Sequence, residues 1–170
     1  MRSVVVCMYI LLALPLYAAA DAPDRSELEK QNLATFYKCR ELAQRASSDS
    51  EADCWADKAM NFGRPVNRAD IKATLDDIRR TFPDFKSELQ EVVADGEWVV
   101  QRSIASGTHL GVAQTTFNGG MLKGVPPTGK RFEMRQTHWF RYKDGKIVEH
   151  WAVRDDLTAM KQLGLVKAAQ

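Results

Sequence analysis

Period-two alternation of apolar and polar residues is clearest between residues 131 and 154, where two β-rich stretches flank Asp144-Gly145. This dipeptide readily takes the positive φ angles of a tight turn, so the pattern predicts an antiparallel hairpin. In the first strand the even positions are mostly apolar and the odd positions mostly charged, which sends the two sets to opposite faces. Gln136 and His138 interrupt the apolar set. Buried polar groups need partners or a ligand, so these two side chains are the first candidates for a functional site.

Helical periodicity dominates the first half of the chain. It predicts a helix from Asp24 to about Ala46, a short second helix beginning near Ser50, and a third helix that Asn67 caps and Pro83 ends. The stretch between the second and third helices, residues 58–66, is expected to be a short strand that runs into a Gly/Pro loop.

The pattern changes from helix to strand beyond residue 84. Two long strands are expected at residues 85–93 and 98–108, followed by a long glycine- and proline-rich loop over residues 110–128. The hairpin and a terminal helical segment at residues 156–164 complete the chain. Helices first and an antiparallel meander last predict an α+β fold, with helices on one face of a curved sheet. Such an arrangement leaves a conical cavity that suits an apolar small molecule.

The N-terminus has the composition of an export signal. A basic start at Arg2, an apolar run over residues 4–16 and small residues at Ala18 and Ala20 are typical of a secretory signal peptide. Residues 1–20 are therefore expected to be removed, leaving residues 21–170 as one exported domain, periplasmic or secreted. An uncleaved membrane anchor is the alternative interpretation, and no later segment is expected to enter a membrane.

The formal net charge is +2, and it becomes +1 when residues 1–20, with one Arg and no acidic residue, are removed. Basic and acidic residues are interspersed, which gives no support for nucleic-acid binding.

The two cysteines of the expected mature chain, Cys39 and Cys54, lie on either side of the turn between the first two helices. An antiparallel helical hairpin would place them opposite each other. In an exported protein this arrangement favours a disulfide worth roughly 3 kcal/mol in the chain-entropy model. Two free buried thiols are the alternative, because disulfide geometry between helices is demanding. No histidine lies near either cysteine in the sequence, so we expect no metal site.

Four motifs extend from the long loop to the C-terminus. They are GVPPTGKRF at residues 124–132, QTH at 136–138, DGKI at 144–147 and QLG at 162–164. Together they resemble the SnoaL-like polyketide cyclases of the nuclear-transport-factor-2-like superfamily, and the order of elements fits from about residue 26 to 165. The resemblance implies a cone, in which a curved and mostly antiparallel sheet wraps around three N-terminal helices and encloses a pocket.

The resemblance also implies a chemistry. The characterised cyclases of this family close a ring by intramolecular aldol condensation on a polyketide methyl ester, without metal or organic cofactor. An acidic side chain on the last strand acts as general acid/base, and Asn61, Gln136 and His138 match the family's pocket groups. The acidic residue should stand two positions after His150, where this chain has Ala152. Because that position holds no carboxylate, a non-catalytic protein that binds small molecules is the alternative function.

The register of the hairpin decides which side chain could replace the missing acid. A regular pairing around a two-residue turn puts Glu149 and Asp155 on the face that carries the two polar residues of the first strand. A bulge would shift the pairing by one residue and turn His150 and Arg154 to that face instead. The sequence leaves both registers open.

His138 and Asp155 are the candidate catalytic residues. His138 would be a general base, and its alternative role is that of a hydrogen-bonded structural histidine. Asp155 would be an acid/base of raised pKa, and its alternative role is an N-cap of the terminal helix; Asp156 has the same alternative and a weaker functional case. The side chains expected to contact the substrate are Asn61, Gln136, Phe140 and Trp151.

Two further side chains have predicted positions outside the pocket. Trp139 alternates with the charged set, so it is expected to cover a helix or the partner in a homodimer or higher homo-oligomer formed through the sheet. His109 lies at a strand end beside a loop and is expected to be solvated. The expected partner is otherwise an apolar small molecule.

Overall fold

The computed structural model describes residues 26–44, 48–115 and 120–166. The elements in chain order are α1 (Glu27–Gln44), α2 (Ser48–Ala52), β1 (Trp55–Asn61), β2 (Arg64–Val66), α3 (Arg68–Thr81), β3 (Lys86–Asp95), β4 (Trp98–Thr108), β5 (Arg131–Lys143), β6 (Lys146–Arg154) and α4 (Asp156–Gln162). The predicted signal peptide lies outside the described residues. Within them, no helix is both long and apolar enough to cross a bilayer.

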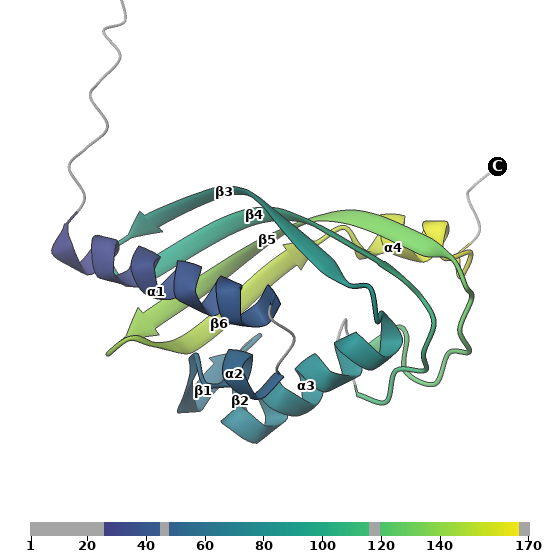
Figure 1. Ribbon diagram of the computed structural model, residues 1–170, viewed down its shortest axis with the longest axis horizontal. Coiled ribbons are helices and arrows are strands. Elements are labelled where there is room, and N and C mark those ends of the chain that lie inside the picture. Colours follow the sequence, from purple (N-terminus) through teal and green to yellow (C-terminus); the bar gives the residue numbers. More distant parts are fainter. Residues whose placement is uncertain (1–25, 45–47, 116–119, 167–170) are drawn as a thin grey trace, which may run out of the picture.

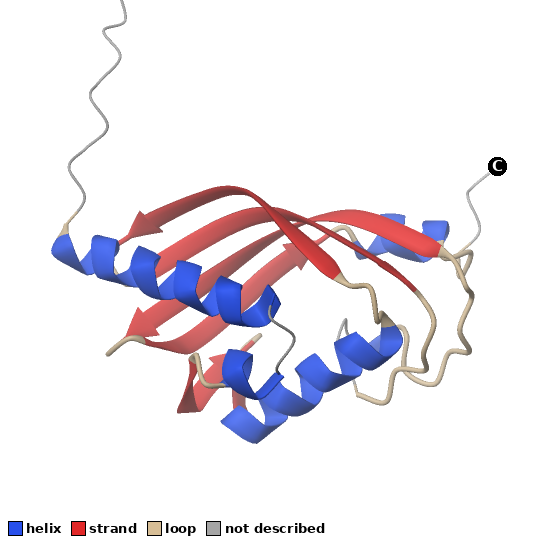
Figure 2. Cartoon of the chain, viewed as in Figure 1, coloured by secondary structure: helices blue, strands red, loops and turns tan. Residues whose placement is uncertain are grey.

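The α+β prediction is confirmed. Six strands form one mixed sheet in the order β2-β1-β6-β5-β4-β3, in which every neighbouring pair is antiparallel except β1 and β6. The sheet arches over α1, with α2 and α3 on the same side (Figures 1 and 2). One prediction for this half was incomplete, because residues 58–66 are not a single short strand. The first strand begins at Trp55, and a turn at Phe62-Gly63, both with positive φ, folds it back onto β2.

Local signals explain the boundaries of α3. Asn67 caps the helix by accepting a hydrogen bond from the Asp70 N–H, and the Asp70 carboxylate accepts from the Asn67 N–H. This reciprocal arrangement is a capping box, which satisfies two backbone donors at the helix start. The prediction that Asn67 caps this helix is therefore confirmed.

The β5–β6 hairpin combines both registers that the sequence left open. Asp144 and Gly145 have φ angles of 50° and 70°, and Lys143 pairs with Lys146, as a tight turn requires. Further along, Arg141 pairs with Glu149, so that Val148 is an extra residue without an opposite partner. This bulge shifts the rest of β6 by one position and decides which of its side chains share a face with those of β5.

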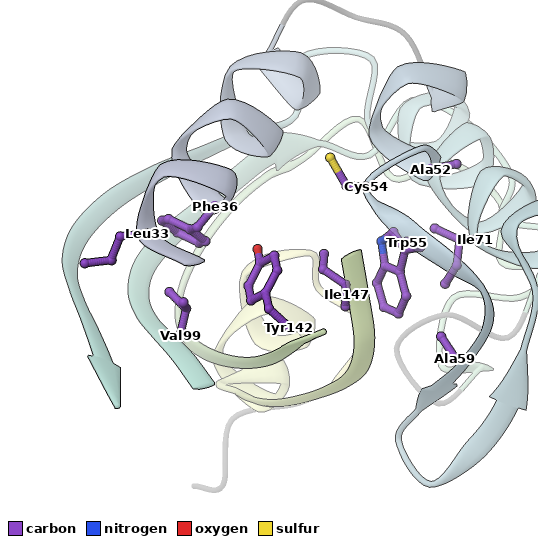
Figure 3. Packing of buried hydrophobic residues seen from close by; sticks show 10 residues of the cluster. All are labelled: Leu33, Phe36, Ala52, Cys54, Trp55, Ala59, Ile71, Val99, Tyr142 and Ile147. Carbon is purple, nitrogen blue, oxygen red and sulfur yellow. The ribbon is translucent and has the colours of Figure 1, made fainter. Parts of the chain in front are cut away.

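Two apolar cores lie on the helix side of the sheet. The first joins α1, α2, α3 and the turn end of the hairpin, and its buried members include Phe36, Trp55, Ile71, Val99 and Tyr142 (Figure 3). The second joins the opposite end of the sheet to α4 and the long loop, and its buried members include Phe82, Leu122, Phe132, Met134 and Leu163.

Polar residues separate these two cores along the sheet. In β5, Gln136 and His138 lie between Met134 of the second core and Phe140, which packs against the first. In β4, Gln101 and Ser103 occupy the corresponding positions, opposite His138 and Gln136. Gln136 and His138, which interrupt the apolar pattern of β5 in the sequence, thus belong to a polar band that crosses several strands.

A disulfide links α1 to the start of the sheet. Cys39 and Cys54 are bonded, with their Cα atoms 6.0 Å apart. Cys54 lies directly before β1 and is buried in the first core. The link therefore fixes the C-terminal half of α1, which carries Arg40, against the strand that carries Asn61.

Candidate functional site

Strand alternation and the Val148 bulge together assemble the candidate site. His138 pairs with Ala152, Phe140 with His150, and Gln136 with Arg154. Residues that pair directly across an antiparallel ladder share a face. This face is the one covered by α1, because the ring of Phe140 lies 6.1 Å from that of Phe36.

A chain of three side chains runs across neighbouring strands of this face. The Nδ1 atom of His138 lies 2.8 Å from Nε2 of His150, and Nδ1 of His150 lies 2.8 Å from Oδ1 of Asn61. The rings of Phe140 and His150 stack with centroids 4.8 Å apart, and His138 stacks on His150 at 5.1 Å. We call Asn61, His150 and His138 the His–His–Asn chain.

The direction of these hydrogen bonds follows from the amide oxygen. Since Oδ1 of Asn61 can only accept, Nδ1 of His150 carries a proton and donates to it. In its neutral form His150 then has a bare Nε2, which accepts from Nδ1–H of His138. The Nε2 atom of His138 consequently carries no proton, and its lone pair is free to accept a hydrogen bond. It is buried and has no hydrogen-bond partner among the described residues.

Burial and nearby cations keep both imidazoles neutral. Burial, with smaller contributions from Arg154 and Arg40, lowers the pKa of His138 from 6.5 to about 4. Burial also holds the pKa of His150 well below its usual value, helped by His138 and Arg154. Near neutral pH the free Nε2 of His138 is therefore an acceptor, able to take a hydrogen bond or a proton from a ligand.

Neutral polar groups and one guanidinium continue the band toward α1. Nε2 of Gln136 donates to Oγ of Ser103 at 3.2 Å, and Nη1 of Arg40 donates to Oε1 of Gln101 at 2.8 Å. Nη2 of Arg40 donates to the backbone oxygen of Ser87, also at 2.8 Å. The Gln136 amide retains a second N–H that could serve a ligand oxygen.

A second guanidinium and a carboxylate lie at the end of β6. Nη2 of Arg154 is 3.3 Å from Oδ2 of Asp156, and the Arg154 guanidinium lies over the Phe62 ring at 5.8 Å. Burial raises the pKa of Asp156, although Arg154 partly offsets this. Asp156 had the weaker functional case on sequence grounds, and it is the carboxylate that pairs with Arg154 of this face.

The structure gives the other candidate acids different surroundings. Asp155 is exposed, and its side chain accepts from the Thr158 N–H at the N-cap of α4. Glu149 lies on the opposite face of the hairpin, where its Oε2 accepts from Nε of Arg141 at 2.8 Å. The register that would have brought Glu149 and Asp155 beside His138 is therefore wrong, because the bulge at Val148 intervenes.

Trp151 also lies outside the polar band. By alternation it occupies the face opposite His150 and pairs with Trp139, and 43% of its surface is exposed. Its ring contacts Phe62 with centroids 6.3 Å apart, and a Cβ at Gly63 would come within 3.3 Å of it. The structure thus brings together Asn61, Gln136, His138 and Phe140 of the predicted site and leaves Trp151 and Asp155 apart.

The prediction that His109 is solvated is wrong. The side chain is fully buried beside Phe82, and its Nδ1 lies 3.4 Å from both the backbone N and Oγ1 of Thr128. Hydrogen bonds between residue 109 and residues 129 and 130 fold the long loop back over the strand end. Only this tertiary contact, and no pattern in the sequence, could have shown that His109 is buried.

Two hollows lie away from the His–His–Asn chain. An open one of about 530 Å³ follows the β1–β2 edge and includes Asp57, Met60 and Arg141. An enclosed one of about 10 Å³ lies in the second core, beside Asp156 and Met134. His138 lines neither of these two hollows. In the described parts of the chain, no three His, Cys, Asp or Glu side chains converge as a metal site would require.

Comparison with known proteins identifies the family of this chain. The sequence model of the family described as SnoaL-like polyketide cyclase matches residues 33–163. Nogalonic acid methyl ester cyclase of Streptomyces nogalater is 35% identical over 89 residues, which cover 51% of this chain and 59% of the relative. The chain spans about half the length of the curated relatives it matches, with shares from 38% to 59%.

Solved structures show the same fold. IdmH from Streptomyces antibioticus superposes with a TM-score of 0.62 at 29% identity, covering 79% of this chain and 99% of that one. A SnoaL-like protein from Jannaschia sp. CCS1 reaches a TM-score of 0.70 over 86% of this chain and all of that one, although it is only 21% identical.

Proposed function

The chain belongs to the SnoaL-like polyketide cyclase family, and we propose that it performs general acid/base chemistry on an apolar carbonyl compound without a cofactor. The observation that carries this proposal is the buried, free Nε2 of His138 at the end of the His–His–Asn chain. Buried polar atoms are normally hydrogen-bonded, so an unpaired one calls for an explanation, and a ligand or a catalytic role is the one proposed here.

The first step would be abstraction of a proton from a carbon next to a carbonyl group. Nε2 of His138 takes this proton, and the electrons of the C–H bond form an enolate. The resulting imidazolium keeps its Nδ1–H bond to His150, whose own orientation Asn61 fixes. Asn61 and His150 are positioning residues in this scheme, because they act on the base and not on the substrate.

The second step would form the new bond. The enolate carbon attacks a second carbonyl carbon of the same molecule, and the alkoxide that forms takes the proton back from Nε2 of His138. Atoms and charge balance, since the proton removed from carbon ends on oxygen. The second N–H of Gln136 would stabilise the enolate oxygen, as preorganised donors do for developing negative charge.

A non-catalytic binding protein is the second candidate function, and one observation favours it. The position directly opposite His138 is Ala152, and the hydrogen-bond partner of His138 among the described residues is His150, which is not a carboxylate. With a pKa of about 4, the unliganded His138 is a weak base. It would then serve only as a hydrogen-bond acceptor for a bound hydroxyl group.

Deuterium exchange separates the two candidates. An aromatic β-keto methyl ester with a second ketone in the same molecule is incubated with protein in D₂O, and NMR follows both exchange at the α-carbon and ring closure. We expect exchange with the wild type and a 10²- to 10⁴-fold lower rate for His138→Ala, the usual range for loss of a general base. Exchange is informative even if the ring does not close.

Thr137→Val is the matched control for this experiment. Thr137 is the neighbour of His138 on the same strand, and its side chain lies on the opposite face, paired with Val153. This variant should exchange at the wild-type rate. If the wild-type protein binds the ester but the α-carbon exchanges no faster than in buffer alone, the protein is a binding protein and not an enzyme for this substrate.

A further inference from the structure

The geometry points to an anionic ligand: we infer that the site takes a planar carbonyl compound bearing a carboxylate or another acidic oxygen, held between Arg40 and Arg154 beside Nε2 of His138. This inference rests on the proposed function in that it names the class of ligand for the same site. It departs from the methyl ester that the curated relatives' names would suggest.

Arg40 supplies the first reason. Its guanidinium makes hydrogen bonds to Oε1 of Gln101 and to the Ser87 backbone oxygen, which are both neutral acceptors. Burial lowers the pKa of Arg40, which shows that the protein environment disfavours this cation. Tyr37 and, to a smaller extent, Glu51 partly oppose this effect, and Glu51 is itself bound to Arg79 at 2.9 Å. A partly buried cation that lacks its own carboxylate is a ready partner for an anion.

Arg154 supplies the second reason. It projects from the same face as His138, two residues beyond Ala152, and only 18% of its side chain is exposed. Among the described residues its carboxylate partner is Asp156, at 3.3 Å through Nη2. A guanidinium has five N–H donors in a planar fork, so much of its bonding capacity toward a carboxylate is unused.

Both cations act on the same histidine. Arg154 and Arg40 are the charged groups that lower the pKa of His138 further after burial has done so. Both histidines are neutral, so among the described residues the charges placed at this site by pairing or by their effect on His138 are the guanidiniums of Arg40 and Arg154 and the carboxylate of Asp156. An anion bound between the arginines would offset their charge and make His138 a stronger base. Ligand binding would in this way prepare the proton transfer.

A matched pair of probes tests the inference by binding alone. 1-Hydroxy-2-naphthoate and its methyl ester have the same aromatic frame and differ in one negative charge. Isothermal titration at pH 7.5 with the intact wild-type protein should show the carboxylate binding at least about tenfold more tightly. That factor corresponds to about 1.4 kcal/mol, the scale of one charge-assisted hydrogen bond.

Three variants locate the preference. Arg40→Gln and Arg154→Gln should each reduce the ratio of carboxylate to ester affinity to about threefold or less. Arg102→Gln removes the same charge from an exposed arginine that pairs with Glu91, and it should keep the wild-type ratio. If Arg40→Gln does not fold, Arg40→Lys keeps the charge but loses the two-pronged contact, and it should still reduce the ratio.

The wild-type comparison alone can overturn the inference, since equal or tighter binding of the ester would contradict it. A ratio reduced equally by Arg102→Gln would also contradict it, because the preference would then reflect overall charge. Failure of the proposed function is distinguishable. In that case the His138→Ala variant would exchange the α-carbon proton of the keto ester at the wild-type rate, whatever the binding probes show. Conversely, exchange that depends on His138 without any preference for the carboxylate would refute the anionic ligand alone.

Discussion

Asp77 of α3 and His138 of β5 are both polar groups in buried surroundings, and the protein treats them in opposite ways. Oδ2 of Asp77 accepts from the Thr115 N–H at 2.7 Å and from Oγ1 of Thr115 at 2.8 Å, and each of its oxygens lies 3.0 Å from the Gln114 N. Arg80 adds an ion pair. His138 has its hydrogen bond to His150 and leaves Nε2 without a partner among the described residues.

The pKa values of the two groups record this difference. Burial alone would raise the pKa of Asp77, but the N–H groups of Thr115 and Gln114 and the hydroxyl of Thr115 bring it below its ordinary value. Burial lowers the pKa of His138 to about 4, and the neighbouring cations lower it further instead of compensating. Asp77 is thus an ionised carboxylate in the folded protein near neutral pH, whereas His138 is a neutral imidazole.

The comparison separates a polar group that the protein satisfies from one that it leaves unpaired. Asp77 joins the end of α3 to the start of the long loop, and its oxygens are occupied by the protein itself. His138 keeps an acceptor without a partner among the described residues, as the proposed base requires. Three changes test this distinction, in order of decreasing expected effect.

The largest effect is expected for Asp77→Asn. The amide has one oxygen in place of two, and its NH₂ group would face backbone donors that now lack an acceptor. Each buried donor left unpaired costs about 1–3 kcal/mol, so the free energy of unfolding should fall by about 3 kcal/mol or more. Urea unfolding followed by circular dichroism measures this change.

Asp76→Asn is the control for that variant. Asp76 is the neighbouring residue, with 40% of its side chain exposed, and it pairs with Lys72 at 2.7 Å on the helix surface. Exposed pairs of this kind contribute less than about 1 kcal/mol. Equal losses in the two variants would show that the hydrogen bonds of Asp77 stabilise the fold no more than a surface ion pair does.

The next effect is a pH dependence of stability that originates at His138. Its pKa is about 4 in the folded protein and near 6.5 when unfolded, so between these values the unfolded chain binds the additional proton. Stability is therefore complete above pH 6.5 and falls as the pH decreases toward 4. From pH 7.5 to 5.0 the loss from this residue should be about 2 kcal/mol.

His138→Gln should remove this contribution to the pH dependence of stability. The glutamine amide can still donate a hydrogen bond to His150, but it does not titrate. Urea unfolding at pH 7.5 and at pH 5.0 measures the difference for both proteins. His150 contributes in the same direction and is present in both proteins; because His138 also lowers the pKa of His150, the difference reports His138 together with its effect on that neighbour. An unchanged dependence on pH would mean that His138 titrates near its ordinary pKa in the folded protein, as a hydrated imidazole does.

The sequence predicted the elements well because local rules govern them. The alternation over residues 98–108 matches the bounds of β4, and the Asp144-Gly145 turn and the Asn67 cap are where the sequence placed them. The family motifs also identified Gln136, His138 and Asn61, which the structure brings to one face.

The rest depended on contacts that local rules do not describe. Val148 is a β-branched residue in a β-rich strand, so nothing in the pattern marks it as the extra residue of a bulge, and the inward position of His150 follows from that bulge. Asp77 reads as an ordinary polar residue of an amphipathic helix, since its partners are backbone groups 37 and 38 residues away. Asp77 and the inward position of His150 were not predicted, because the hydrogen bonds and the strand register that define them are tertiary features.

The smallest effect tests the comparison directly, by giving His138 a charged partner such as Asp77 has in Arg80. Ala152 lies directly opposite His138, and the Cβ atoms of such a pair are about 5 Å apart. In Ala152→Asp the new carboxylate should raise the pKa of His138 by about 1 unit or more, because an opposite charge at this distance favours the imidazolium. NMR titration of the histidine ring protons measures the shift, with His138→Gln assigning the signal.

Ala152→Asn provides the uncharged control, because it adds a side chain of the same size and should leave the pKa of His138 near 4. In Ala152→Asp the higher pKa also narrows the gap from the unfolded value, so the stability lost between pH 7.5 and 5.0 should decrease. If His138 is the base proposed here, α-carbon exchange should become faster, since a base works best with a pKa near the working pH. A pKa that stays near 4 in both variants would show that burial alone controls His138 and that position 152 does not reach it.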